Sequence, residues 1–179
     1  MTPRNTDMTL VYLKPGEMHL TAEPTLVTTV LGSCVSVTMY NPRLGIGAIC
    51  HIMLPKCKCK ENCSDDCMQC LRDAGNGCHR ECDDSFRYAD CSIPSMLKTF
   101  KECVVGPEEL EVKMFGGSDM LSSRGRGGSI INVGKQNIEA ALQGIEGEGL
   151  KLSTYDVGGS SGRKILFYTH TGEVFLKRL

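Results

Sequence analysis

The sequence LVTTVLGSCVSVTMY, residues 26–40, contains two short apolar runs with a glycine-serine pair between them. Both runs are rich in β-branched side chains and have the length of a strand. Gly32 and Ser33 are residue types that interrupt strands and form turns. The stretch therefore predicts two strands joined at a tight corner, with Cys34 directly after the turn.

The same alternation of short runs and turn residues continues on both sides of this stretch. In the N-terminal part, strands are expected at Met8–Leu13, Leu26–Leu31, Val35–Tyr40 and Gly45–Leu54. Apolar residues at helical spacing predict a helix from Ile93 to Val104, with Pro94 in its first turn, and another from Asn137 to Ile145. Asn137 is expected to cap that second helix, and contact with a functional site is its alternative role. Further strands are expected at Glu111–Phe115, Ser129–Asn132, Leu150–Val157, Arg163–Thr169 and Glu173–Leu179, with a hairpin turn at Thr171-Gly172.

Length and composition favour one α/β domain covering residues 1–179. Many short strands with two helices are typical of a layered α/β fold rather than a doubly wound parallel sheet. The 20 basic and 21 acidic residues give a net charge of -1, which argues against general nucleic-acid binding. Apolar stretches are too short to cross a bilayer, and residues 1–7 contain no apolar run typical of a secretory signal. We therefore expect a cytoplasmic protein that is not inserted in a membrane.

Cysteine is the unusual feature of the composition. Eight of the 11 cysteines lie between Cys57 and Cys91, in a segment with few large apolar residues. In a reducing compartment, clustered thiols suggest metal ligands or free thiols, and a structural zinc ion or a disulfide would hold such a core-poor insertion together. The spacing Cys63-x3-Cys67-x2-Cys70 also matches that of some iron-sulfur clusters. A partly disordered loop of free thiols is the remaining alternative. The candidate metal ligands are Cys63, Cys67, Cys70, Cys78 and Cys82.

Cys34 and His51 form a candidate catalytic pair. A cysteine nucleophile needs a nearby imidazole, and His51 comes back beside Cys34 if the strand around it pairs with the strand that follows Cys34. A hydroxyl on a neighbouring strand, such as that of Thr28, could fix the imidazole tautomer. Amide groups of the turn at Gly32 and Ser33 could stabilise an oxyanion. A buried cysteine with a structural histidine is the simpler alternative.

Several motifs, in this order, make the chain resemble the CheD family of chemoreceptor glutamine deamidases. They cover nearly all of the sequence outside residues 57–86, so the cysteine-rich insertion is the part that the resemblance does not explain. The matching segments are TTVLGSCV (28–35), HIMLP (51–55), RYAD (87–90), KMFGGSDM (113–120), VGKQN (133–137), DVGG (156–159), Gly162-Arg163 and the terminal hairpin through Thr171-Gly172.

The resemblance implies an α/β sandwich like that of the glutamine-deamidating toxins. It implies a triad of Cys34 as nucleophile, His51 as general base and then acid, and Thr28 as the hydroxyl that orients the histidine. The implied reaction converts chemoreceptor glutamines to glutamates through a thioester and releases ammonia, without a cofactor. Hydrolysis of receptor methyl esters and binding of a regulatory CheC-type phosphatase are also implied.

Two other classes of function remain as alternatives. The chain could be a non-catalytic adaptor of the same fold that binds a CheC-type phosphatase, although intact Cys34, His51 and Thr28 favour the enzyme. It could instead be a zinc or iron-sulfur protein in which the cysteine cluster is the functional part. A redox-dependent lid over Cys34 is a further hypothesis for that cluster.

Overall fold

The computed structural model describes residues 8–57, 85–103, 105–119 and 132–179. These residues form strands that belong to two sheets, two α-helices and two short 3-10 turns. The strands are β1 (Thr9–Tyr12), β2 (Met18–Thr21), β3 (Thr25–Leu31), β4 (Val35–Asn41), β5 (Ile46–Ile52), β6 (Glu111–Gly116), β7 (Leu152–Val157), β8 (Arg163–Tyr168) and β9 (Val174–Arg178); the helices are α3 (Ala89–Glu102) and α4 (Val133–Gly147), and the 3-10 turns are η1 (Ser85–Arg87) and η2 (Pro107–Glu109).

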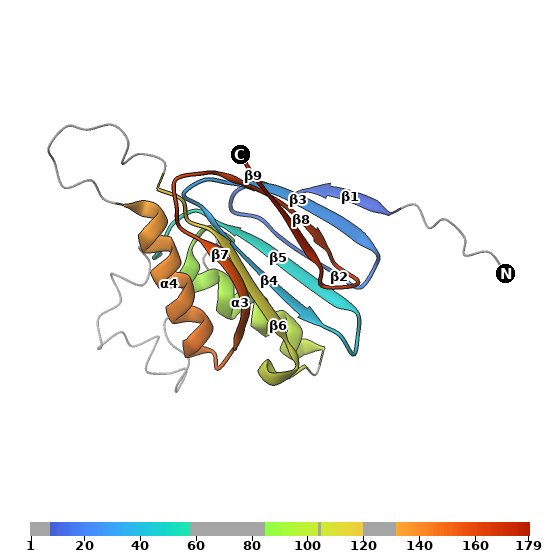
Figure 1. Ribbon diagram of the computed structural model, residues 1–179. Helices are drawn as coiled ribbons and strands as arrows, with labels where there is room; N and C mark the ends of the chain where they lie inside the picture. Colours follow the sequence, from blue (N-terminus) through green and yellow to red (C-terminus); the bar gives the residue numbers. More distant parts are fainter. Residues whose placement is uncertain (1–7, 58–84, 104, 120–131) are drawn as a thin grey trace, which may run out of the picture.

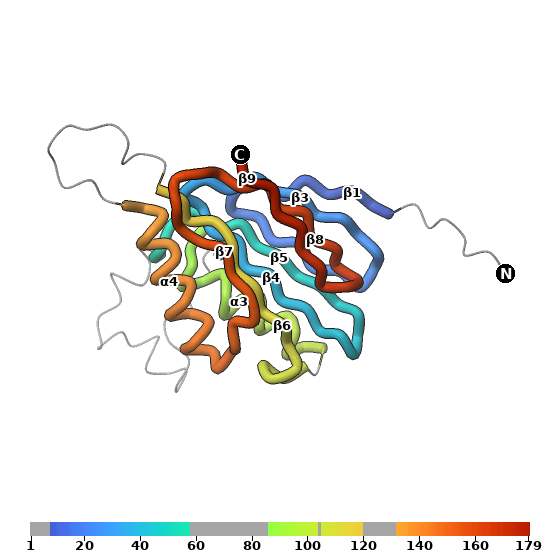
Figure 2. Tube along the Cα trace, viewed as in Figure 1, coloured from blue at the N-terminus to red at the C-terminus, as the bar shows by residue number. Residues whose placement is uncertain are grey.

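The molecule is layered, as the sequence predicts. The smaller sheet has the strand order β1-β3-β8-β9, and the larger sheet has the order β2-β5-β4-β6-β7. The two sheets lie face to face, and α3 and α4 lie against the other face of the larger sheet (Figure 1). The chain passes from the smaller to the larger sheet between β3 and β4, as the continuous tube in Figure 2 shows. Gly32-Ser33 thus forms a corner between two sheets.

Side-chain alternation along β4 separates two buried regions. Val35, Val37 and Met39 point to the helices and join the larger core, together with residues of α3 and α4. Ser36 has the opposite parity, so it points toward the smaller sheet. The smaller core fills the space between the sheets and consists of Leu13, Val27, Leu31, Ile49, Phe115, Ile165 and Phe167.

The predicted pairing of the strands around Cys34 is confirmed. β4 pairs antiparallel with β5, and Ser36 lies opposite His51 in that register. On its other side β4 pairs antiparallel with β6, which ends at Gly116 opposite Val35. The chain immediately before β4 is therefore flanked by the last residues of β5 and β6.

Both helices begin earlier than the sequence predicts. α3 starts at Ala89 rather than Ile93, because the Leu54 carbonyl accepts the Ala89 N–H at 2.9 Å and thereby extends the helix N-terminus. Pro94 consequently lies inside the helix and not in its first turn. α4 starts at Val133, and its N-cap is Asn132, whose Oδ1 accepts the Lys135 N–H at 2.8 Å.

The structure also tests the predicted helix cap, several predicted strands and the predicted hairpin. The prediction of Asn137 as the N-cap is wrong, since Asn137 lies in the second turn of α4. β2 was not expected, because its four residues, MHLT, are too few to give a clear alternation. The strand expected at Ser129–Asn132 falls mostly on residues 129–131, which lie outside the described residues, while Asn132 begins the helix. The hairpin between β8 and β9 is confirmed, with Gly172 at a φ of 72°.

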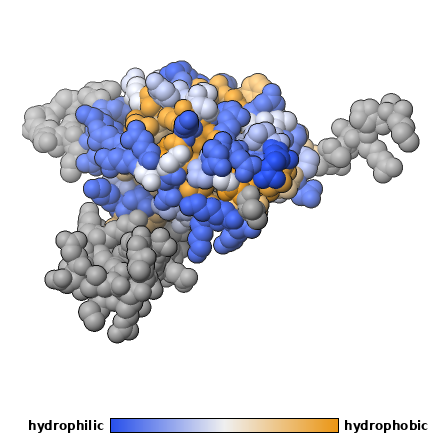
Figure 3. All heavy atoms as spheres, turned by 90° about the horizontal axis from the view of Figure 1, so that it is seen from below, coloured by the Kyte–Doolittle hydropathy of each residue, from blue (hydrophilic) through white to orange (hydrophobic). Residues whose placement is uncertain are grey.

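The surface of the described part is mixed in character. Figure 3 shows one face on which hydrophilic side chains surround a smaller area of hydrophobic ones. None of the helices in the described residues is long and apolar enough to cross a membrane.

Candidate active site

Cys34 lies at the corner between the two sheets. It directly precedes β4, is half-buried, and packs against the core between the sheets. Two backbone hydrogen bonds hold the corner to the end of β6: Gly117 N–H donates to the Cys34 carbonyl at 2.7 Å, and Ser118 N–H donates to the Gly32 carbonyl at 2.8 Å. The residue is thus fixed on a rigid backbone, while part of it remains open to solvent.

Glycines permit this close contact. Gly116 and Gly117 have φ angles of 105° and 68°, in the region that side chains disfavour. A Cβ on Gly116 would collide with the Cys34 carbonyl, and one on Gly117 would lie 2.5 Å from the Ile138 side chain. The turn at this pair directly supports the corner that carries Cys34.

His51 shares the space between the sheets with Cys34. It belongs to β5, is 2% exposed, and lies opposite Ser36 in the ladder with β4. Cys34 comes two residues before Ser36, and side chains two residues apart point to the same side of a strand. Such diagonal neighbours on adjacent strands lie about 7–8 Å apart between Cα atoms, within reach of a thiol and an imidazole.

Thr29, and not Thr28, contacts the imidazole. Thr29 Oγ1 lies 2.8 Å from His51 Nδ1 and donates its own proton to the Leu13 carbonyl at 2.9 Å. Because that hydroxyl proton is already used, the Thr29 oxygen accepts from an Nδ1–H, which leaves Nε2 unprotonated. His51 Nε2 is buried and has no hydrogen-bond partner among the described residues. It is therefore available as a proton acceptor.

The assignment of Thr28 as the orienting hydroxyl is not supported by this geometry. Val27, Thr29 and Leu31 alternate with Thr28 along β3, and the first and last of these three belong to the core between the sheets. Thr28 consequently points to the opposite face of the smaller sheet. Its Oγ1 is buried and makes no hydrogen bond within the described part of the chain.

Burial keeps both candidate groups neutral. It lowers the pKa of His51 to about 4, and a hydrogen bond to the Leu13 backbone carbonyl and the charge of Glu17 oppose this shift only partly. Burial also raises the pKa of the Cys34 thiol above its ordinary value. Near neutral pH the pair is thus a thiol and an imidazole, and not a preformed ion pair.

Asn137 extends from α4 into the same corner. Its side chain is fully buried, and its Nδ2 donates to the Ser33 carbonyl at 3.0 Å and to the Met53 carbonyl at 2.9 Å. Ser33 is next to Cys34, and Met53 follows His51 by two residues. The alternative role of Asn137, contact with the site, is therefore the one that the structure favours.

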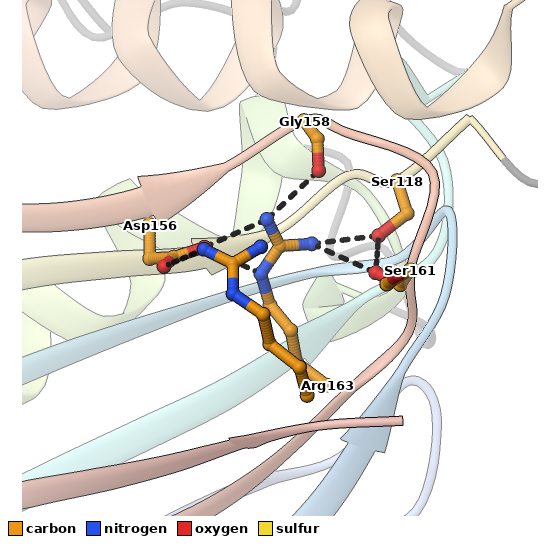
Figure 4. Close-up of polar contacts among 6 residues, drawn as sticks. Ser118, Asp156, Gly158, Ser161 and Arg163 are labelled. Atoms are coloured by element: carbon orange, nitrogen blue, oxygen red, sulfur yellow. Dashed lines mark hydrogen bonds and ion pairs between the residues drawn. The ribbon is translucent and has the colours of Figure 1, made fainter.

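A buried arginine stabilises the loops behind the corner (Figure 4). Arg163 is 1% exposed, and its guanidinium pairs with Asp156 at 2.7 Å and donates to Ser118 Oγ at 2.6 Å. It also donates to the carbonyls of Gly158 and Ser161. Five donors in a planar fork suit such a set of acceptors. The network fixes Ser118, whose N–H holds the corner at Gly32.

The predicted metal ligands cannot be placed. Cys63, Cys67, Cys70, Cys78 and Cys82 all lie outside the described residues, as does the cysteine-rich insertion between residues 58 and 84. Cys57, which directly precedes the insertion, is buried, and its N–H donates to the carboxylate of Asp90. Within the described ranges, no group of three or more metal-ligating side chains occurs.

Comparisons with known proteins point to one family. A family model described as CheD chemotactic sensory transduction matches residues 71–178. A protein of Geobacter sulfurreducens named "Probable chemoreceptor glutamine deamidase CheD 2" is 47% identical over 179 residues, covering 100% of this chain and 96% of the relative.

Two further relatives carry the name "Probable chemoreceptor glutamine deamidase CheD". The one from Maridesulfovibrio salexigens is 38% identical, covering 100% of this chain and 97% of its own length. The one from Oleidesulfovibrio alaskensis is 36% identical, covering 94% and 72% respectively. The family match begins after Cys34 and His51, but the alignments over 100% of this chain include both residues.

Proposed function

The chain belongs to the CheD family, and from that premise we propose that it is a cysteine-dependent glutamine deamidase acting on chemoreceptors. It aligns with nearly the whole length of two relatives that are named as probable chemoreceptor glutamine deamidases. The observation that carries the proposal is that the side chains of Thr29, His51 and Cys34 all lie in the space between the two sheets. A nucleophile, a base and a group that orients the base are the parts that acyl transfer requires.

The proposed reaction begins with proton transfer from Cys34 to His51. Nε2 of the neutral imidazole takes the thiol proton as the sulfur attacks the side-chain carboxamide carbon of a receptor glutamine. The C–S bond forms, and the carbonyl oxygen becomes an oxyanion. Thr29 stabilises the tautomer that this step needs and accepts the Nδ1–H of the resulting imidazolium.

Collapse of this intermediate releases ammonia. The imidazolium donates its Nε2 proton to the leaving nitrogen, the C–N bond breaks, and a thioester to Cys34 remains. His51 then deprotonates a water molecule that attacks the thioester. The C–S bond breaks, Cys34 regains a proton, and the receptor carries a glutamate. The proposed steps involve no metal or organic cofactor.

The same acyl-enzyme would form from a glutamyl methyl ester, with methanol leaving in place of ammonia. We therefore include receptor methylesterase activity in the proposal. A CheC-type phosphatase is the proposed regulatory partner, competing with receptor helices for the surface near Cys34. The proposed location is the cytoplasm, and the proposed role of Cys63, Cys67, Cys70, Cys78 and Cys82 is a structural zinc site outside the catalytic centre.

Mass spectrometry of a chemoreceptor cytoplasmic fragment tests the proposal. The fragment, shown beforehand to be converted by another glutamine deamidase, is incubated with the wild-type protein, with Cys34→Ala, or with Cys103→Ala as a control. Cys103 is an exposed cysteine at the end of α3, so its removal should leave the site intact. Separate samples contain a chelator or a reductant.

We expect glutamine-to-glutamate conversion by the wild type and by Cys103→Ala, none by Cys34→Ala, and no effect of the chelator. Absence of conversion by the wild type on this validated fragment would overturn the enzyme assignment. A non-catalytic adaptor that binds a CheC-type phosphatase would then be favoured. Loss of activity with the chelator would instead show that the active protein needs a bound metal ion, such as the proposed structural zinc.

A further inference from the structure

Asn137 fixes the backbone on both sides of the reacting pair. Its Nδ2 donates to the carbonyl of Ser33, the residue before Cys34, and to the carbonyl of Met53, beyond His51 on the adjoining strand. These partners lie 104 and 84 residues away in sequence. One side chain of α4 therefore ties the end of β5 to the corner that carries the nucleophile.

The chemistry of the two partners determines the orientation of the amide. Both are carbonyl oxygens, and only the NH₂ end of a carboxamide can donate to two acceptors. Asn137 Oδ1 is buried and has no hydrogen-bond partner among the described residues. A buried oxygen without a partner destabilises a fold, so a purely structural role accounts poorly for an asparagine at this position.

The bond to Ser33 also sets the direction of an unused donor. The peptide between Ser33 and Cys34 is trans, so its carbonyl and its N–H point to opposite sides. With the Ser33 carbonyl held against Asn137, the Cys34 N–H points away from α4. Within the described residues, this N–H donates no hydrogen bond.

We propose that Asn137 is a positioning residue that holds the Ser33–Cys34 peptide so that the Cys34 N–H stabilises the oxyanion. This inference rests on the proposed deamidase function. The sulfur of Cys34 adds to the carboxamide carbon, and the oxygen that becomes negative then lies near the N–H of the same residue. Such preorganised donors contribute strongly to acyl transfer, because they need no reorganisation during the reaction. Asn137 itself transfers no proton and touches no reacting atom.

Two variants of the same helix test the proposal. Asn137→Ala removes both hydrogen bonds, whereas Asn132→Ala removes the helix N-cap and a bond to Asp119 but leaves both Asn137 bonds in place. On a receptor fragment, we expect Asn137→Ala to lower kcat about 10- to 100-fold with little change in KM. Asn132→Ala should change kcat by less than about threefold, because it leaves the bonds from Asn137 to the Ser33 and Met53 carbonyls intact.

Two reagents then distinguish positioning from a general loss of structure. A receptor peptide with an aldehyde in place of the glutamine carboxamide forms a hemithioacetal with Cys34, which places an oxygen where the oxyanion would lie. Iodoacetamide alkylates the thiol by displacement of iodide and needs no oxyanion donor. Asn137→Ala should bind the aldehyde about tenfold or more weakly than the wild type, with an alkylation rate close to that of the wild type.

A measurement on the wild type keeps the proposal testable if Asn137→Ala does not fold. The amide proton resonance of ¹⁵N-labelled Cys34 should move downfield when the aldehyde binds, as expected for a new hydrogen bond. An unmoved Cys34 amide, or a kcat of Asn137→Ala equal to that of Asn132→Ala, would overturn the inference while leaving deamidation intact. Failure of the wild type to deamidate the fragment would overturn the proposed function, and the inference with it.

Discussion

Thr29 on the smaller sheet and His51 on the larger sheet are joined by a hydrogen bond of 2.8 Å between Oγ1 and Nδ1. The imidazole is thus oriented by a strand of the opposite sheet and not by a neighbour in its own ladder. Thr29 in turn donates to the Leu13 carbonyl, which fixes its hydroxyl proton. These two hydrogen bonds assign the Nδ1–H tautomer to His51 and leave Nε2 unprotonated, as the proposed proton transfer from Cys34 requires.

The two adjacent threonines should differ sharply in their effect on activity. Thr29→Val removes the acceptor for the Nδ1–H, so we expect kcat to fall at least about tenfold. Thr28→Val replaces a buried hydroxyl that makes no hydrogen bond, so activity should be retained and stability unchanged or slightly higher. Steady-state kinetics and thermal unfolding of both variants provide the test. A larger loss of kcat in Thr28→Val would restore that residue as the orienting hydroxyl.

The pH dependence of the reaction should reflect a neutral imidazole. Because the pKa of His51 is about 4, its base form is fully populated well below neutral pH. We expect kcat/KM on a receptor fragment to be flat between about pH 6 and 8 and to fall only in more acidic solution. Measurement of kcat/KM across this range, with buffers of constant ionic strength, provides the test. An acidic limb centred near 6.5 would contradict the burial of the histidine.

The same burial should make stability depend on pH. The pKa of His51 is near 6.5 when unfolded and about 4 when folded, so the unfolded chain binds the proton first as the pH falls. The His51 contribution is therefore fully present above about pH 6.5 and is lost progressively towards pH 4, by up to about 3 kcal/mol.

Urea unfolding at both ends of that pH range measures this loss. His51→Gln is the control, because its side chain does not titrate and can still donate to Thr29. The free energy of unfolding of the wild type should fall more steeply between neutral and acidic pH than that of the variant. Equal slopes for the two proteins would show that His51 is not the group responsible.

Gly117 should tolerate alanine less well than Gly159 does. Both have a positive φ, of 68° and 71°, so a side chain costs about 1–2 kcal/mol of conformational energy at either position. A Cβ on Gly159 meets nothing within 4 Å, whereas one on Gly117 contacts Ile138 and the Gly134 carbonyl. We expect Gly117→Ala to be the less stable protein and to lose activity, since its N–H holds the Cys34 carbonyl.

Chemical denaturation and turnover of the two glycine variants check this prediction. Gly159→Ala controls for the conformational effect alone. Equal free energies of unfolding would contradict the steric contact proposed for Gly117.

Arg163 should matter far more for folding than Arg178, although both pair with Asp156. Arg163→Ala removes a buried charge with several hydrogen bonds and should destabilise the fold by about 3–5 kcal/mol. The Arg178 side chain is 60% exposed, and Arg178→Ala should cost less than about 1 kcal/mol. Thermal unfolding of the two variants provides the comparison. A similar loss in both would mean that the Asp156 pairs, and not the bonds to Ser118, stabilise these loops.

The sequence predicts the strands around Cys34 because their signals are local. Short β-branched runs separated by Gly32-Ser33 indicate β3 and β4, and the length of the next run indicates β5. The antiparallel pairing of β4 with β5 then follows from the short connection between them. This is also why His51 could be predicted near Cys34 without a structure.

The local sequence does not determine which of Thr28 and Thr29 points toward the larger sheet. The run from Leu26 to Leu31 has no clean polar-apolar alternation, and both threonines are buried, so the pattern does not mark the inward face. A shift of one residue reverses every side chain, and only the packing of the smaller sheet on the larger one decides it. The inward position of Thr29 is therefore a tertiary property.

For a related reason, the sequence indicates site contact by Asn137 only as an alternative to helix capping and does not indicate the roles of Ser118 and Arg163. Asn137 bonds to residues 104 and 84 positions away, and Arg163 bonds to Ser118 across 45 positions. No spacing rule connects them. The available signal is that Asn137 lies four residues before Ala141, on the same buried helix face, where burial of an amide requires partners.

The corner between β3 and β4 is assembled from nearly the whole chain, and this has a consequence during protein synthesis. Its supports arrive late: Asn137 comes from α4, and β8, which pairs with β3, carries Arg163. In a nascent chain, the proposed nucleophile Cys34 is therefore translated well before the residues that support its backbone. We therefore expect the corner to be complete only after α4 and β8 have been translated.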